Sequence, residues 1–120
     1  MVNLLNFAHP IMDKQLNKLN QQTGVQTYEV KNIPVQLDVR EPFVQQVNNL
    51  LVEFEKEYKG RWKKGQYLVN FPSLNFITAL LLIRMHKWMG HYPKIIRIAR
   101  DEKSRSPKFE VVAVIDLDSV

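Results

Sequence analysis

The stretch YLVNFPSLNFITALLLIRMHKWMG, residues 67–90, decides the fold expected for this chain. Its first five residues, Tyr67 to Phe71, form a short apolar run that is typical of a buried strand. Ser73 is a residue type that caps helices, and it precedes an apolar segment that ends at Gly90. We therefore predict a strand, a tight connection, and a helix over residues 74–89 that Ser73 caps.

The predicted helix is apolar on nearly every side in its middle, from Phe76 to Ile83. A helix of this kind has no ordinary solvent face. It is either covered by the sheet and its neighbours or it forms a subunit interface, and the sequence leaves both alternatives open. The apolar run is far shorter than the roughly 20 residues that cross a bilayer, so we expect no membrane partner.

Strand and helix patterns alternate through the rest of the chain. The elements expected before residue 67 are a strand over residues 2–7, a helix from an N-cap at Asp13 to about Gln22 with Gly24 as its left-handed end, a strand over residues 25–30, and a helix from Pro42 to about Gly60. After Pro93, strands over residues 95–100 and 109–117 are expected to form an antiparallel hairpin. The order β-α-β-α-β-α-β-β predicts a single α/β domain, residues 1–120, with a Rossmann-like, mostly parallel sheet and helices on both faces.

The composition favours a soluble, cytoplasmic protein with an anionic partner. The 120 residues are 45% hydrophobic, which is enough for one buried core. The chain has no cysteine, and its N-terminal residues read as a strand and not as a signal peptide. The formal net charge is +5, and basic residues gather between Lys59 and Lys64 and between Arg97 and Lys108. A solubilising surface is the alternative explanation for each basic cluster.

The candidate ligand site follows from the expected sheet. In an open parallel sheet, ligands bind beyond the carboxyl ends of the strands where the strand order reverses, which we expect between the first and third strands. These strands end in similar segments, Asn6-Phe7-Ala8-His9-Pro10 and Asn70-Phe71-Pro72-Ser73. The two asparagine amides, the Ser73 hydroxyl and the first N–H groups of its helix could bind a nucleotide-like ligand. Turn formation and helix capping explain either segment taken alone.

Several other chemistries lack their motifs in this sequence. The Gly-rich phosphate loops of dinucleotide-binding proteins and NTPases do not occur. The three histidines, His9, His86 and His91, lack the spacing of a metal site, and we expect neither a metal nor another cofactor. His9 is a candidate general base or phosphate contact at the end of the first strand. From their positions in and after the third helix, His86 and His91 are expected to have structural roles.

Five segments together give the chain a resemblance to a known family. They are Asn6-Phe7-Ala8-His9-Pro10, Ile33-Pro34-Val35-Gln36-Leu37-Asp38, Leu68-Val69-Asn70-Phe71-Pro72, Met89-Gly90-His91-Tyr92-Pro93 and Phe109-Glu110-Val111. In this order and spacing, over nearly the whole chain, they resemble the Csx-fifteen family of small accessory proteins from type III CRISPR loci. Proteins of this family look like relatives of the Rossmann-like CARF sensors and have been linked to cyclic oligoadenylates.

The resemblance implies a cyclic oligoadenylate ligand, with cyclic tetra-adenylate favoured, and a homodimer that could assemble further on the ligand. With the residues that its motifs add, the candidate ligand-binding residues are Asn6, His9, Gln36, Asn70, Pro72, Ser73 and His91. One function is sequestration, in which the protein binds this second messenger and dampens type III signalling. The alternative is a metal-independent ring nuclease that cleaves the messenger. We favour binding because the sequence shows no acid and base pair. A protein-interaction module and a generic RNA-binding protein are further alternatives.

Overall fold

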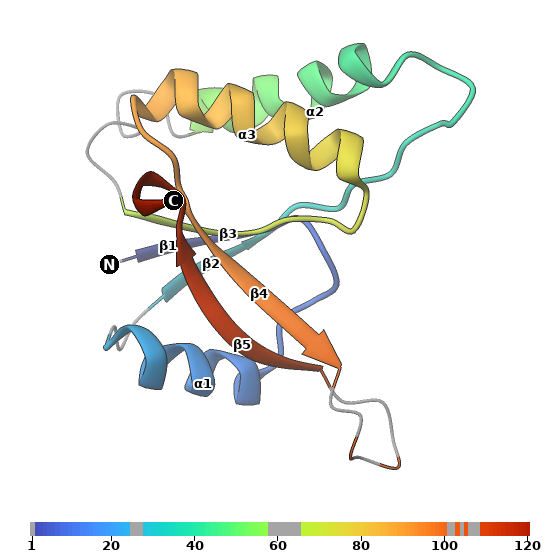
Figure 1. The fold of residues 1–120 in the computed structure, drawn as a ribbon. Helices are drawn as coiled ribbons and strands as arrows, with labels where there is room; N and C mark the ends of the chain where they lie inside the picture. The colour runs from blue at the N-terminus through green and yellow to red at the C-terminus, as the bar shows by residue number, and fades with distance from the viewer. Residues whose placement is uncertain (1, 25–27, 58–65, 101–102, 104, 106–108) are drawn as a thin grey trace.

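A computed structural model of the chain describes residues 2–24, 28–57, 66–100, 103, 105 and 109–120. The chain forms a five-stranded sheet with helices on both faces (Figure 1). In chain order the elements are β1 (Val2–Asn6), α1 (Asp13–Thr23), β2 (Tyr28–Asn32), α2 (Phe43–Glu57), β3 (Tyr67–Asn70), α3 (Asn75–Met89), β4 (Lys94–Arg100), β5 (Phe109–Asp116) and a short 3-10 helix, η1 (Leu117–Ser119). The predicted α/β class with a mostly parallel sheet is confirmed. The predictions for residues 25–27 and 58–64 lie outside the described residues.

The strand order in the sheet is β2-β1-β3-β4-β5. β1 pairs in parallel with β2 and β3, β3 pairs in parallel with β4, and β5 runs antiparallel to β4. The connection through α1 leads to one side of β1, and the connection through α2 leads back to its other side. The strand order therefore reverses between β1 and β3. In open parallel sheets this reversal is where the ends of the strands leave room for a ligand.

Two apolar clusters hold the helices against the sheet. α2 and α3 cover one face, where Leu51 and Leu81 pack with Leu5 of β1 (Figure 1). α1 covers the other face through Leu19, which packs with Leu4 of β1. Successive side chains of a strand point to opposite faces, so adjacent leucines of β1 serve both clusters. The central strand is thus buried between two helical layers except at Asn3, which is partly exposed.

The predicted cap of α3 is wrong by one residue. α3 begins at Asn75, and the preceding residue, Leu74, is extended and contributes no side-chain cap. The Thr78 hydroxyl donates instead to Pro72 O over 3.0 Å, which ties the connection to the first turn of the helix. Ser73 therefore precedes the helix as an exposed residue and does not cap it. The helix ends where the sequence predicts, at a left-handed Gly90 with φ of 79°.

The start of α1 also differs from the prediction. Asp13 is the first helical residue, and Met12 occupies the N-cap position. The Gln15 side chain accepts a hydrogen bond from Met12 N over 2.8 Å, which pairs the backbone N–H of the N-cap residue as the third helical residue of a capping box does. Asp13 instead places its charge in the first turn, where the helix dipole favours an acidic side chain. Gly24 ends the helix with φ of 73°, as predicted.

α3 presents an inner and an outer apolar side. Its inner side is buried and consists of Ile77, Leu81, Met85 and Met89, spaced four residues apart. On its outer side Phe76 is 69% exposed and Ile83 is 55% exposed. The sheet therefore covers only one side of this helix, and the outer side carries apolar surface that no other described residue covers. None of the described helices is long and apolar enough to cross a membrane.

The orientation of α3 predicts unequal costs for two similar substitutions. Leu81→Ala should lower the free energy of unfolding by about 2 to 5 kcal/mol, because it empties a completely buried position. Ile83→Ala is the matched control, because it shortens a nearby aliphatic side chain that is mostly exposed, and it should cost less than about 1 kcal/mol. Urea denaturation followed by circular dichroism measures both values. Equal losses would contradict the orientation of the helix.

Candidate functional site

Three asparagines end three neighbouring strands at one level of the sheet. Asn6 ends β1, Asn32 ends β2 and Asn70 ends β3, and Asn6 is the register partner of both others. Asn70 Nδ2 donates to Asn6 Oδ1 over 2.9 Å, and Asn6 Nδ2 donates to Asn32 Oδ1 over 2.9 Å. We call this row of amides, with the segments that follow the three strands, the carboxyl edge. The predicted meeting of the segments after β1 and β3 is therefore confirmed.

Asn6 is the centre of this row and has no hydrogen-bonding capacity left. Its Oδ1 accepts from Asn70 Nδ2 and from Ala8 N, the latter over 3.1 Å. Its Nδ2 donates to Asn32 Oδ1 and to His9 O, the latter over 2.8 Å. An amide side chain has two donor and two acceptor positions, so all four are filled, and the residue is completely buried. Asn6 shapes the carboxyl edge and is not itself available to a ligand.

Asn70 is the asparagine that keeps free hydrogen-bonding groups. It is 6% exposed, and its side chain bonds to Asn6 alone among the described residues. Its Oδ1 and one N–H position therefore remain open at the carboxyl edge. Of the two amides predicted to contact a ligand, Asn70 is the one whose chemistry permits contact.

His9 is exposed at the carboxyl edge on a backbone that Asn6 holds in place. The bond from Asn6 Nδ2 to His9 O fixes the turn after β1. The His9 imidazole forms no hydrogen bond or ion pair with any described residue, and the side chain is exposed. Both ring nitrogens are therefore free to meet a ligand as donor or acceptor.

The first turn of α3 supplies backbone donors beside Ser73. No side chain caps this helix end, so the first N–H groups of α3 have no side-chain acceptor at the N-cap. They follow the carboxyl end of β3, in the segment that also carries Asn70 and the exposed Ser73 hydroxyl. Uncapped N–H groups together with the positive end of the helix dipole favour an anionic group.

Gln36 lies on the connection that leaves the carboxyl end of β2. Its side chain is exposed and bonds to no other described residue. Further along the same connection, Gln46 of α2 accepts from Asp38 N over 2.7 Å and donates to Asp38 O over 2.8 Å. These two bonds hold the turn that carries Arg40, whose N–H donates to Asp38 Oδ1. The Gln46 side chain of α2 therefore holds this connection in place, and Gln36 and Arg40 are exposed on it.

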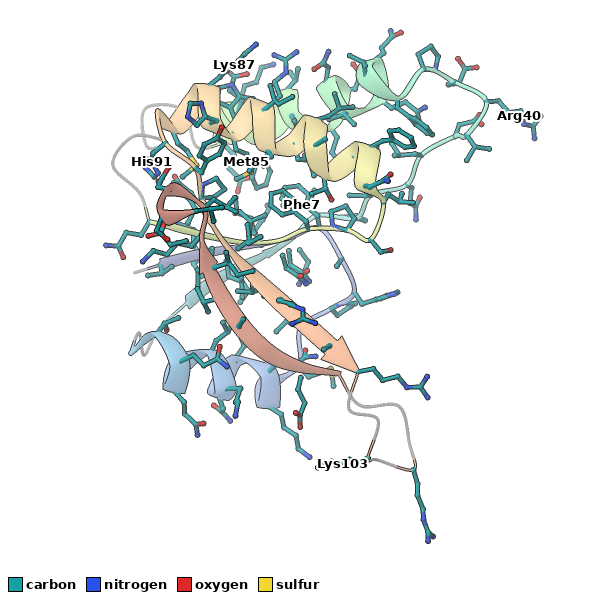
Figure 2. The ribbon with its side chains drawn as sticks, in the orientation of Figure 1. Phe7, Arg40, Met85, Lys87, His91 and Lys103 are labelled. Atoms are coloured by element: carbon teal, nitrogen blue, oxygen red, sulfur yellow. The ribbon has the colours of Figure 1, made fainter. Side chains whose placement is uncertain are left out.

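Basic side chains flank the carboxyl edge on both sides. Arg40 and Lys103 extend from the side of the molecule where the parallel strands end (Figure 2). Arg97 and Arg100 are exposed on β4, beyond the Val69–Ile95 register pair that joins β4 to β3. The carboxylates on this side, including Asp38, offset part of this charge. The predicted basic cluster at residues 59–64 lies outside the described residues.

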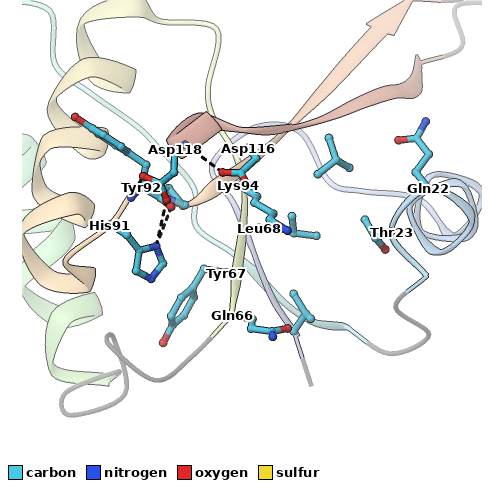
Figure 3. A pocket seen from close by; sticks show the side chains of 13 residues that line it. Gln22, Thr23, Gln66, Tyr67, Leu68, His91, Tyr92, Lys94, Asp116 and Asp118 are labelled. Carbon is cyan, nitrogen blue, oxygen red and sulfur yellow. Dashed lines mark hydrogen bonds and ion pairs between the residues drawn. The ribbon is translucent and has the colours of Figure 1, made fainter. Parts of the chain in front are cut away.

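His91 lies at the opposite edge of the sheet from the other six candidate residues. A cavity of about 560 Å³ opens there, where β1, β3 and β4 begin (Figure 3). We call it the amino-edge cavity, and its polar lining includes Gln22, Gln66, His91, Lys94, Asp116 and Asp118. His91 Nδ1 is 2.9 Å from Tyr92 O and 3.9 Å from Asp118 Oδ2. His86, predicted to be structural, packs its ring 4.3 Å from that of Tyr92.

Three residues that organise the two edges were not predicted from the sequence. Asn32 completes the asparagine row, and it was missed because the second strand was expected to end at residue 30. An asparagine at the end of each of three successive strands is the signal that could have found it. Gln46 accepts a hydrogen bond from Asp38, which lies 8 residues earlier in the sequence, and Asp118 accepts one from Tyr92, which lies 26 residues earlier. No short sequence pattern predicts such contacts.

Comparisons with known proteins found no matching family model, no matching curated protein and no matching solved structure. Within the part of the chain that the structure describes, no three His, Asp or Glu side chains are grouped as metal ligands. The function is therefore inferred from the geometry and chemistry of the two edges of the sheet.

Asn6→Ala should lower the free energy of unfolding by roughly 2 to 4 kcal/mol, because four hydrogen bonds are lost and buried partners stay unsatisfied. Asn49→Ala is the control, because it makes the same change at an exposed residue of α2 whose side chain bonds to no described residue, and it should cost less than about 1 kcal/mol. Chemical denaturation measures both. A cost for Asn6→Ala no greater than that of the control would show that the amide row does not hold the strand ends together.

Proposed function

We propose that this protein binds a cyclic oligoadenylate, with cyclic tetra-adenylate favoured, at the carboxyl edge and sequesters it, which dampens type III CRISPR signalling. The proposal includes a Rossmann-like, CARF-related domain that acts as a homodimer in the cytoplasm. One support is the resemblance of the ordered motifs to the Csx-fifteen family. The other is the chemistry of the carboxyl edge.

The observation that carries the proposal is the set of unused polar groups where the strand order reverses. The free side of Asn70, the His9 imidazole and the Ser73 hydroxyl lie on the segments that Asn6 and Asn70 join. The uncapped first turn of α3 follows directly. Neutral donors, a helix N-terminus and nearby guanidinium groups suit the phosphates and base edges of a small nucleotide ligand.

Sequestration is favoured over cleavage by the surroundings of His9. Metal-independent cleavage would require a base to take the proton of a ribose 2′-hydroxyl held in line with the phosphate. His9 could supply this base, which keeps the ring nuclease as the second candidate function. Among the described residues, however, no carboxylate or second imidazole forms a hydrogen bond that would orient its ring. An unoriented imidazole suits a ligand contact better than a general base.

The homodimer is proposed to form through the outer side of the α2 and α3 layer. A groove lined by Pro42, Phe43, Val44, Phe76, Ala79 and Leu80 is almost entirely apolar. Both helices begin at this groove, on the same side of the molecule as the carboxyl edge. Two copies joined by a two-fold axis here would offer two carboxyl edges to a ligand that itself has rotational symmetry.

Ser73→Asp should weaken binding of cyclic tetra-adenylate at least tenfold, because it sets a negative charge beside the uncapped N–H groups of α3. Gln21→Glu is the matched control, because it makes the same charge change at an exposed position of α1, and it should bind as the unmodified protein does. Radiolabelled ligand on native gels measures affinity, and denaturing gels detect cleavage.

Each outcome of this experiment has a defined meaning. Shifted but intact ligand supports sequestration, and linear product would establish the ring nuclease. Absence of both would remove the cyclic tetra-adenylate proposal. Equal losses in Ser73→Asp and Gln21→Glu would mean that general charge, and not the carboxyl edge, drives binding.

Phe76→Asp should convert the homodimer to a monomer, because it introduces a charge into the apolar groove. Met12→Asp is the control, since Met12 is 65% exposed and lies just before α1 on the other face of the sheet. Sedimentation velocity measures the oligomeric state of both variants. A monomeric unmodified protein, or a dimer lost only in Met12→Asp, would contradict the proposed interface.

A further inference from the structure

We propose that the amino-edge cavity is a second ligand site and that it binds a small zwitterion with the charge pattern of a free α-amino acid. The cavity is separate from the carboxyl edge, because it opens where the parallel strands begin and not where they end (Figure 3). The inference therefore does not depend on the proposed function of the carboxyl edge.

Two carboxylates in the cavity are held by backbone donors. Tyr92 N donates to Asp118 Oδ1 over 3.3 Å, and Asp118 N donates to Asp116 Oδ1 over 3.1 Å. Each aspartate therefore keeps a second oxygen that receives no hydrogen bond from a described residue. In a chain with a net charge of +5, two fixed carboxylates in one cavity make a local site for an amino group.

The ammonium group of Lys94 lines the same cavity. Lys94 and Asp116 are direct register partners in the antiparallel pair of β4 and β5, so their side chains leave the same face of the sheet. Even so, no ion pair joins Lys94 to either aspartate among the described residues. The Lys94 ammonium and the two carboxylates thus line one cavity without forming an ion pair in the part of the chain that the structure describes.

These charges select the class of ligand. A phosphate or a simple carboxylic acid would meet two aspartates, and a simple amine would leave Lys94 without a partner. A ligand with an amino group and a carboxylate satisfies both, and a free α-amino acid carries the two on one carbon atom. The volume of about 560 Å³ lies in the range of small-molecule pockets, roughly 300 to 1,000 Å³. Gln22 and Gln66 add neutral amides for a ligand side chain.

His91 lines the cavity beside Asp118, whose Oδ2 lies 3.9 Å from its Nδ1. In the neutral ring, a proton on Nδ1 would be donated to Tyr92 O, which leaves Nε2 as an acceptor. The ring lies on the same side of the cavity as Tyr67, and its second nitrogen points away from Asp118 (Figure 3). An acceptor in this position is available to a donor group elsewhere on the ligand, such as one on its side chain.

The test is a thermal-shift screen of the full chain with the proteinogenic α-amino acids, followed by calorimetric titration of those that bind. We expect at least one amino acid to raise the melting temperature, because a ligand that binds only the folded state stabilises it. Its N-acetyl and α-amide derivatives, which each lack one charge, should bind at least tenfold more weakly. Asp118→Asn and Lys94→Gln should each weaken binding of the free amino acid at least tenfold.

Two matched controls make the same chemical changes away from the cavity. Asp13→Asn and Lys14→Gln alter exposed residues at the other end of α1 and should bind the amino acid normally. No response to any amino acid would overturn the inference. So would equal binding of the blocked derivatives, or equal losses in the control variants. Because Asp118 and Lys94 are exposed side chains, their variants should keep the circular dichroism spectrum of the unmodified protein.

Discussion

The saturated side chain of Asn6 is the constraint on which the carboxyl edge depends. It joins the ends of β1, β2 and β3 and also holds the turn that carries His9. A buried amide is costly unless every donor and acceptor is paired, so these four bonds tolerate little displacement of the three strands. The exposed groups around Asn6 are therefore presented by a rigid frame. Asn70, His9 and Ser73 keep polar groups that form no hydrogen bond with a described residue, and these are the groups proposed to contact the ligand.

The main features of the fold were predictable because they depend on local signals. Short apolar runs separated by amphipathic or apolar helices give the α/β class, and glycine is needed where α1 and α3 end in a left-handed conformation. The helix starts were not predictable from residue type alone. Ser73 and Asp13 are good capping residues, but Leu74 and Met12 hold the cap positions. The tertiary course of each connection decides which residue stands there.

The candidate site was predictable in outline and not in its chemistry. Parallel strands end at a common edge, so the meeting of the Asn6 and Asn70 segments follows from the strand pattern. The register that places Asn32 beside Asn6 decides which asparagine side chain has all of its hydrogen-bonding positions filled. The strand pattern does not specify that register. His91 belongs to the other edge because β3 and α3 run in opposite directions along the sheet. Asp118 lies beside His91 only because η1 folds back against the start of β4.

The central claim is that the carboxyl edge receives an anionic nucleotide ligand while Asn6 maintains its shape. Titration of ¹⁵N-labelled protein with cyclic tetra-adenylate, followed by ¹H–¹⁵N correlation spectra, tests this most directly. We expect the largest shifts at the Asn70 side-chain amide and at the backbone N–H groups from Ser73 into the first turn of α3. The signals of residues that line the amino-edge cavity should stay in place. Shifts confined to that cavity, or no shifts at all, would contradict the claim.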